Sequence, residues 1–141
     1  MTRLPALRSA RSLRPSPPEM TRARQTLGSR GEALACRELR RRGYAILARR
    51  FRTRFGEIDI IARDGDALVV VEVKTRRTAG YGGAVAAVGY RKQRRLVNMA
   101  RSYLAGLSGP EPAIRFDVVG VTLAEGAKPA VEVVVDAFQA W

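Results

Sequence analysis

Two carboxylates and an amine, Asp59, Glu72 and Lys74, interrupt two otherwise apolar runs and are the residues best suited to chemistry. Two carboxylates about 6 Å apart repel each other by about 3 kcal/mol at an effective dielectric constant of about 20. A divalent cation between them would remove that repulsion, and oxygen ligands of this kind, with the carbonyl of Val73 as a further donor, are what Mg²⁺ prefers. An ammonium group beside the cation could orient or deprotonate a water molecule and stabilise the charge that develops when a phosphodiester is attacked. The spacing therefore predicts a metal-dependent phosphodiesterase.

A β-hairpin would bring these side chains together, and the sequence predicts one. The dipeptide Asp64-Gly65 between two apolar runs is a strong hairpin signal, because both central residues of a type I′ turn need positive φ. With these two as the loop, Asp59 lies opposite Val70 and Glu72 is its diagonal neighbour. Side chains alternate along a strand, so the three charged residues share one face. The other face is apolar and is expected to be core, which sets the register. Its residues are Ile58, Ile60, Val69, Val71 and Val73.

Other residues have a structural interpretation as well as a chemical one. Glu57 falls on the predicted charged face, where it either adds to the repulsion or is simply exposed at a strand start. Asp117, inside an apolar strand, either belongs to a site or forms a structural salt bridge with an arginine. Glu32 lies near the start of a predicted helix, where the helix dipole stabilises an acid. Cys36 is expected to be a small buried hydrophobe.

The order of motifs along the chain resembles a known family. The matching segments are Gly31-Glu32-Ala33, Gly56-Glu57-Ile58-Asp59, Val71-Glu72-Val73-Lys74-Thr75-Arg76, Lys92-Gln93 and Arg115-Phe116-Asp117-Val118-Val119. From about residue 28 to the C-terminus, the chain resembles the YraN-like family of small bacterial proteins, which has a restriction-endonuclease-like fold, and it is similar to the archaeal Holliday-junction resolvases.

The resemblance implies an α/β fold, with a mixed β-sheet flanked by helices, and an endonuclease that cuts DNA, including branched or flapped DNA. It implies Asp59 and Glu72 as ligands of Mg²⁺ or Mn²⁺, Glu32 as an outer carboxylate that reaches the metal, and Lys74 as the base that orients water. A homodimer is also suggested, since a resolvase must cut two strands. The alternative is a non-catalytic nucleic-acid-binding module that keeps the fold.

The charge balance favours a nucleic-acid partner. The chain has 26 Lys and Arg against 13 Asp and Glu, a net charge of +13, and a strongly basic domain is typical of phosphate binders. Basic proteins also include ribosome-associated and membrane-surface proteins, but neither predicted helix has more apolar surface than a core needs, so we expect no membrane partner. The residues expected to contact nucleic acid without reading its sequence are Arg76, Arg77, Arg91, Lys92, Gln93, Arg94 and Arg95. Lys92 and Gln93 either line the cleft or cap a helix.

The composition also excludes several kinds of chemistry. A single cysteine excludes an internal disulfide, and the absence of histidine excludes zinc fingers, His-based triads and an imidazole base. The sequence shows neither the apolar core of a secretory signal nor a stretch of transmembrane length, so a cytoplasmic location is expected.

The chain divides near residue 27. Residues 1–27 are rich in Arg and Pro and are expected to form a disordered, dispensable tail; an organellar transit peptide or a true start at Met20 are the alternatives. Residues 28–141 are expected to form one domain of order α-β-β-β-α-β-β. Its helices are predicted from residue 28 to Gly43 and from Gly89 to Leu107. The Gly-rich segment from Thr75 to Gly83 is expected to be a mobile loop beside the site.

Overall fold

The computed structural model describes residues 19–78 and 83–140, with side chains from residue 26 onward. In chain order the elements are α1 (Glu19–Arg41), β1 (Ala45–Thr53), β2 (Gly56–Asp64), β3 (Ala67–Arg76), α2 (Gly83–Ala86), α3 (Tyr90–Ala105), β4 (Ala113–Thr122) and β5 (Ala130–Phe138). The predicted α/β class and the order α-β-β-β-α-β-β are confirmed, with the short α2 added before α3. No helix in these ranges is long and apolar enough to cross a membrane.

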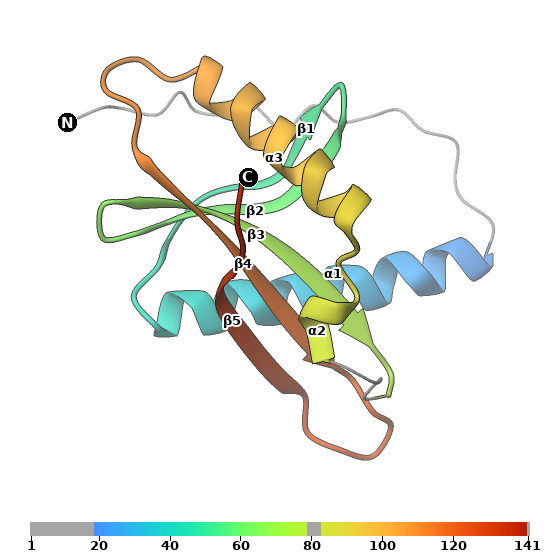
Figure 1. Ribbon diagram of the computed structural model, residues 1–141. Helices are drawn as coiled ribbons and strands as arrows, with labels where there is room; N and C mark the ends of the chain where they lie inside the picture. The colour runs from blue at the N-terminus through green and yellow to red at the C-terminus, as the bar shows by residue number, and fades with distance from the viewer. Residues whose placement is uncertain (1–18, 79–82, 141) are drawn as a thin grey trace.

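The five strands form one sheet in the order β1-β2-β3-β4-β5. Neighbouring strands are antiparallel except β3 and β4, which run parallel. A parallel pair needs a crossover connection, and the segment containing α2 and α3 supplies it. Figure 1 shows α1 and α3 on opposite faces of the sheet. β3 lies in the middle of this arrangement and is covered on both faces, which explains its continuous run of valines.

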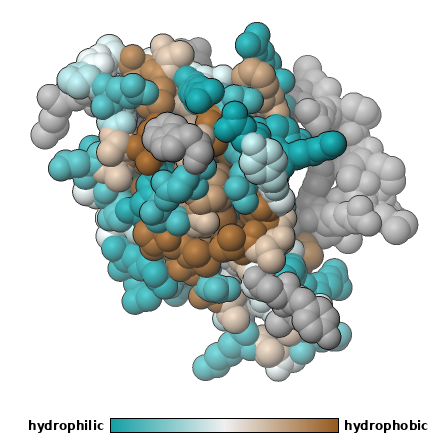
Figure 2. Space-filling model, in the orientation of Figure 1, coloured by the Kyte–Doolittle hydropathy of each residue, from teal (hydrophilic) through white to brown (hydrophobic). Residues whose placement is uncertain are grey.

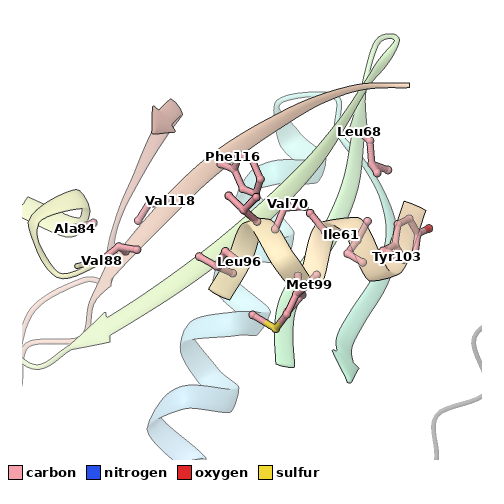
Figure 3. Close-up of a cluster of buried hydrophobic side chains, with 13 residues drawn as sticks. Ile61, Leu68, Val70, Ala84, Val88, Leu96, Met99, Tyr103, Phe116 and Val118 are labelled. Carbon is pink, nitrogen blue, oxygen red and sulfur yellow. The ribbon is translucent and has the colours of Figure 1, made fainter. Parts of the chain in front are cut away.

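Two hydrophobic clusters hold the helices to the sheet. The cluster on the α3 face includes Leu96 and Met99 of α3 with Val70 of β3, and Figure 3 shows these side chains where α3 crosses the strands. The cluster on the α1 face includes Leu39 of α1 with Val71 of β3. Figure 2 shows a central apolar area framed by hydrophilic side chains in the orientation of Figure 1.

The β2–β3 hairpin forms as predicted, but its register differs by two residues. Asp64 pairs with Ala67, so the loop residues are Gly65 and Asp66 rather than Asp64 and Gly65. Gly65 has φ +58° and occupies the first central position, where a type II′ turn places its glycine. A shift of two residues leaves every β3 side chain on its predicted face.

The sheet divides at the point where β2 leaves β3. Among the described residues, β2–β3 pairing ends at Ile60 and Val71, whereas β1–β2 pairing continues to the hairpin end at Gly56. We call residues 51–58, the part of the β1–β2 hairpin beyond this fork, the arm. β3 continues from the fork alongside β4.

The arm turns over as it leaves the sheet. Ile60 packs in the α1-face cluster, but Ile58, two residues earlier on the same strand, packs in the α3-face cluster. The prediction that Ile58 and Ile60 share a face is therefore wrong. Arg50 of β1 lies between Arg49 and Phe51, the partners of Ile60 and Ile58, and has φ +52°. This left-handed conformation is uncommon for a residue with a side chain, and it breaks the regular alternation of side chains along the strand.

Two predicted boundaries change. The first helix begins at Glu19, so residues 19–27 are helical and are not part of a disordered tail; residues 1–18 lie outside the described residues. The predicted loop from Thr75 to Gly83 is shorter, because Thr75 and Arg76 belong to β3 and Gly83 begins α2. Part of the segment predicted as a mobile loop, residues 79–82, also lies outside the described residues.

Candidate active site

The fork brings the two predicted carboxylates together. Asp59 and Glu72 are the first residues beyond the last β2–β3 pair, Ile60 with Val71. Instead of a backbone carbonyl of β2, the Oδ2 atom of Asp59 accepts the hydrogen bond from the Val73 backbone N–H, at 2.8 Å. The Asp59 side chain therefore reaches across the fork to β3.

Two ammonium groups hold one oxygen of Glu72. Its side chain is 5% exposed, and Oε1 lies 3.5 Å from Nζ of Lys74 and 3.4 Å from Nζ of Lys92. The other oxygen, Oε2, is buried and has no hydrogen-bond partner. Lys92 comes from α3, so β3 and α3 both contribute to the site. A buried, unpartnered carboxylate oxygen is expensive to maintain in a protein without a ligand.

Burial and charge repulsion change the ionisation of Asp59. Burial is the main cause that raises its pKa to about 7, and the neighbouring Glu72 carboxylate adds to the rise. The hydrogen bond from Val73 opposes the rise, whereas a side-chain hydrogen bond with Glu72 and, last, the charge of Glu32 add to it. At neutral pH Asp59 is therefore only partly ionised, and a bound cation would favour its ionised form.

Glu32 is positioned by a close contact between α1 and β3. A Cβ atom on Gly31 would lie 2.8 Å from Cβ of Thr75, so only glycine allows the helix to approach this closely. Glu32, which is 7% exposed, then lines a pocket of about 320 Å³ together with Asp59 and Val73. The pair Gly31-Glu32, which is recognisable in the sequence, thus also has a structural role: the glycine lets α1 approach β3 and so places Glu32 in the pocket.

The oxygens of Glu32 are bound by two arginines that the sequence did not single out. Nε of Arg49 lies 3.1 Å from Oε1, and Nε of Arg50 lies 3.2 Å from Oε2. Arg50 also donates a hydrogen bond to Ser29 at 3.0 Å. No local pattern separates these two residues from the other arginines of the chain, because their role depends on α1 crossing β1.

The donor set fits a hard divalent cation held by few protein ligands. Across the described residues there is no group of three Asp, Glu, Cys or His side chains arranged to hold a metal. The fork offers two carboxylates, and Oε2 of Glu72 has no hydrogen-bond partner. Asp59 lines the pocket with Val73 and Glu32, whereas Glu72 faces the lysines of β3 and α3. Mg²⁺ is commonly held by one or two carboxylates with water completing its shell. Glu32 lines the pocket with both of its oxygens paired to arginines.

The residues predicted to contact nucleic acid differ in their exposure and in what they contact. Lys92 reaches the site, while the Gln93 amide donates to the Val88 carbonyl at 2.9 Å and so stabilises the start of α3. Arg76 is half-buried, and its Nε is buried without a partner. The exposed members of the set are Arg77, Arg91, Arg94 and Arg95.

Two further acids lie outside the site. Glu57 pairs with Arg52 at 3.3 Å, so it does not join Glu72. Asp117 is 1% exposed and accepts hydrogen bonds from Tyr44 at 2.7 Å and from Arg115 at 2.9 Å. The structural interpretation of Asp117 is confirmed. Cys36 is buried, as predicted.

The fold and fork define an α/β protein of restriction-endonuclease-like topology, and comparison with known proteins identifies its family. A family model described as "Uncharacterised protein family UPF0102" matches residues 31–121. Similar proteins include UPF0102 proteins of Anaeromyxobacter dehalogenans, 50% identical over 77% of this chain and 81% of the relative, and of Rhodococcus opacus, 47% identical over 79% and 95%. The UPF0102 protein of Geobacter sulfurreducens is 47% identical over 80% of this chain and 88% of the relative. The chain belongs to the UPF0102 family, which confirms the YraN-like resemblance.

Proposed function

We propose that this protein is a metal-dependent endonuclease that hydrolyses phosphodiester bonds in DNA. Asp59 and Glu72 would hold Mg²⁺ or Mn²⁺ at the fork, with the Val73 carbonyl as a further ligand. The bound cation would supply Lewis-acid activation of the phosphate and of the attacking water. Lys74 would orient that water.

One observation carries this proposal. The Oε2 atom of Glu72 is buried and unpartnered beside Asp59, whose pKa is raised to about 7. An unsatisfied buried oxygen costs about 1–3 kcal/mol or more, and the crowded carboxylates add repulsion. Such costs are typical of sites whose ligand relieves them.

The surroundings of the site suit a polyanionic substrate. The net charge is +13, and Lys74 and Lys92 converge on Glu72 from two elements. Once a cation neutralises the carboxylates, both ammonium groups are available to a phosphate. DNA affinity should fall steeply with salt concentration through counterion release. An affinity that stays constant between low and moderate salt would contradict the DNA assignment.

A second candidate function is a nucleic-acid-binding module that does not cut. The observation that favours it is Glu32, whose two oxygens are bound by Arg49 and Arg50 rather than directed at a cation. Under this second function the fork carboxylates take no part in catalysis, and the basic surface binds the nucleic acid.

The experiment that separates the two functions uses three variants. Purified protein is incubated with duplex, branched and single-stranded DNA and Mg²⁺ or Mn²⁺, and binding is measured in parallel. Asp59→Ala and Lys74→Ala should abolish cleavage while binding persists. Glu57→Ala is the matched control, because this acid lies on the same strand as Asp59 but pairs with Arg52 away from the fork. Binding without cleavage by the unmodified protein, with every metal and substrate, would support the module.

A further inference from the structure

The tip of the arm has residues that its turn does not require. Thr53 pairs with Gly56, so Arg54 and Phe55 are the two loop residues. Two-residue hairpin loops favour Asn, Asp and Gly because these residues tolerate positive φ. Neither loop residue here has positive φ, whereas the opposite hairpin of β2 uses Gly65 at φ +58°. Turn geometry therefore does not explain why an arginine and a phenylalanine occupy the tip.

The tip is held rigidly. The Thr53 hydroxyl accepts a hydrogen bond from the Phe55 N–H at 3.1 Å and donates one to the Gly56 carbonyl at 3.0 Å. The arm also packs against α3, because Phe51 and Tyr103 form an edge-to-face pair with ring centroids 5.1 Å apart. The backbone that carries Phe55 therefore has little conformational entropy left to lose on binding.

Phe55 is exposed and has a cation beside it. It is 37% exposed, and the Arg54 guanidinium lies 4.7 Å from the centre of its ring. An exposed aromatic ring next to an arginine is the combination on which proteins stack bases of unpaired strands while contacting the backbone.

The tip is connected to the fork by one face of α3. Lys92 contacts Glu72 at the fork, and the Met99 sulfur would lie 3.5 Å from a Cβ placed on Gly56 at the tip. These α3 residues are seven apart, which is about 10 Å along the helix axis. The exposed Arg95 lies between them on the same face, because residues three and four apart are neighbours on a helix. Positive charge thus lines the route from the fork to the tip.

We infer that the arm tip is a second DNA contact, at which Phe55 stacks on an unpaired base. This inference rests on the proposed function and names its substrate class, DNA with unpaired nucleotides next to the bond that is cut. The stacked base would lie a few nucleotides from the scissile phosphate, because the fork and the tip flank the same stretch of α3. Freeing a base from a duplex costs a few kcal/mol, as much as stacking returns. Flapped or branched DNA is therefore preferred over intact duplex.

The test measures binding without relying on cleavage. Fluorescence anisotropy compares a duplex with the same duplex carrying a single-stranded flap, in EDTA. Phe55→Ala should weaken flap binding about tenfold and leave duplex binding unchanged. Phe55→Leu, which keeps apolar volume without an aromatic ring, should behave like Phe55→Ala, and Phe55→Trp should retain flap binding. Thermal unfolding of each variant checks that the arm is intact.

Tyr90→Ala is the matched control. Tyr90 is 74% exposed, more than Phe55, but it lies about 200° around α3 from Lys92. Removing the Tyr90 side chain should change neither the affinity for the flap nor the affinity for the duplex. A 2-aminopurine base placed at each of the first five flap positions should be quenched most at one of them, and only when Phe55 is present.

Several outcomes would overturn the inference. They are equal affinity of the unmodified protein for flap and duplex, equal weakening of both by Phe55→Ala, or full flap binding by Phe55→Leu. Failure of the proposed function looks different, because it appears as the absence of cleavage whatever the substrate, while the flap preference in EDTA persists.

Discussion

The pH dependence of stability tests how the fork is built. The pKa of Asp59 is raised from an ordinary 3.8 to about 7, by burial first and then by Glu72. Between about pH 4 and pH 7 the folded chain holds a proton that the unfolded chain has released, so the free energy of unfolding falls as pH rises through this window. At about 1.4 kcal/mol per pH unit the whole loss is on the order of 4 kcal/mol, and more than half of it falls between pH 5 and pH 8. Partial exposure of the side chain reduces the loss in this range to about 2 kcal/mol.

Asp59→Asn should remove most of that slope. The amide oxygen can accept the hydrogen bond from Val73, as Oδ2 does at 2.8 Å, and the amide NH₂ can donate to Glu72 as the protonated acid would. The variant should therefore match the unmodified protein at pH 5 within about 1 kcal/mol and exceed it by about 2 kcal/mol at pH 8. Urea unfolding of both proteins in EDTA across this range measures the difference.

The absence of histidine makes the measurement clean. No imidazole titrates between pH 5 and pH 8, and groups far from the fork contribute equally to both proteins. Parallel pH profiles for the two proteins would refute the reasoning, as would an unmodified protein whose stability rises with pH over this range. Either result would mean that Asp59 is solvated and does not crowd Glu72.

Three further changes have defined outcomes. Mg²⁺ at pH 8 should raise the melting temperature of the unmodified protein and leave that of Asp59→Asn unchanged, because only a native state that binds the ion is stabilised. Equal shifts of the two melting temperatures in calorimetry would contradict a site at the fork. Gly31→Ala should destabilise the protein by about 1–3 kcal/mol, since the added Cβ overlaps β3. Gly28→Ala should stabilise α1 by up to about 1 kcal/mol, because no atom lies within 4 Å of its Cβ. Urea unfolding of the two variants distinguishes the effect of the contact from that of helix propensity. Asp117→Ala should cost about 2–4 kcal/mol, because the Tyr44 hydroxyl and the Asp136 N–H lose their acceptor and Arg115 loses one of its two carboxylate partners. Glu57→Ala should cost under about 1 kcal/mol in the same assay, and similar losses from both would contradict the structural role of Asp117.

The sequence predicted the elements well because their signals are local. Alternation, helical spacing and turn residues report on neighbours in the chain, so the order of helices and strands and the pairing of β2 with β3 followed directly. The loop of that hairpin was misassigned by one residue because Asp-Gly and Gly-Asp both suit tight turns and the sequence Asp64-Gly65-Asp66 contains both. The start of α1 was placed too late because the arginines and prolines before residue 19 dominated the composition.

The site was predictable only in part. Asp59, Glu72 and Lys74 carry a recognisable spacing, and Glu32 followed from the family resemblance. The partners of Glu32 depend on where α1 crosses β1, and the contact of Lys92 with Glu72 depends on how α3 crosses the fork. Such long-range packing leaves no periodic trace in a single sequence.

The two residues other than glycine with positive φ among those described, Arg50 and Asp136, lie on β1 and β5, the outer strands of the sheet. Each outer strand also contains a break in its pairing register, at Leu47 on β1 and around Asp136 on β5. An exposed strand edge is a template for adding another strand, and charged kinks of this kind interrupt that template. The two edge strands, β1 and β5, are thus protected against the strand-by-strand addition that forms fibres. If two copies of the chain associate, they should meet through helices or loops, and not by continuing one sheet into the next.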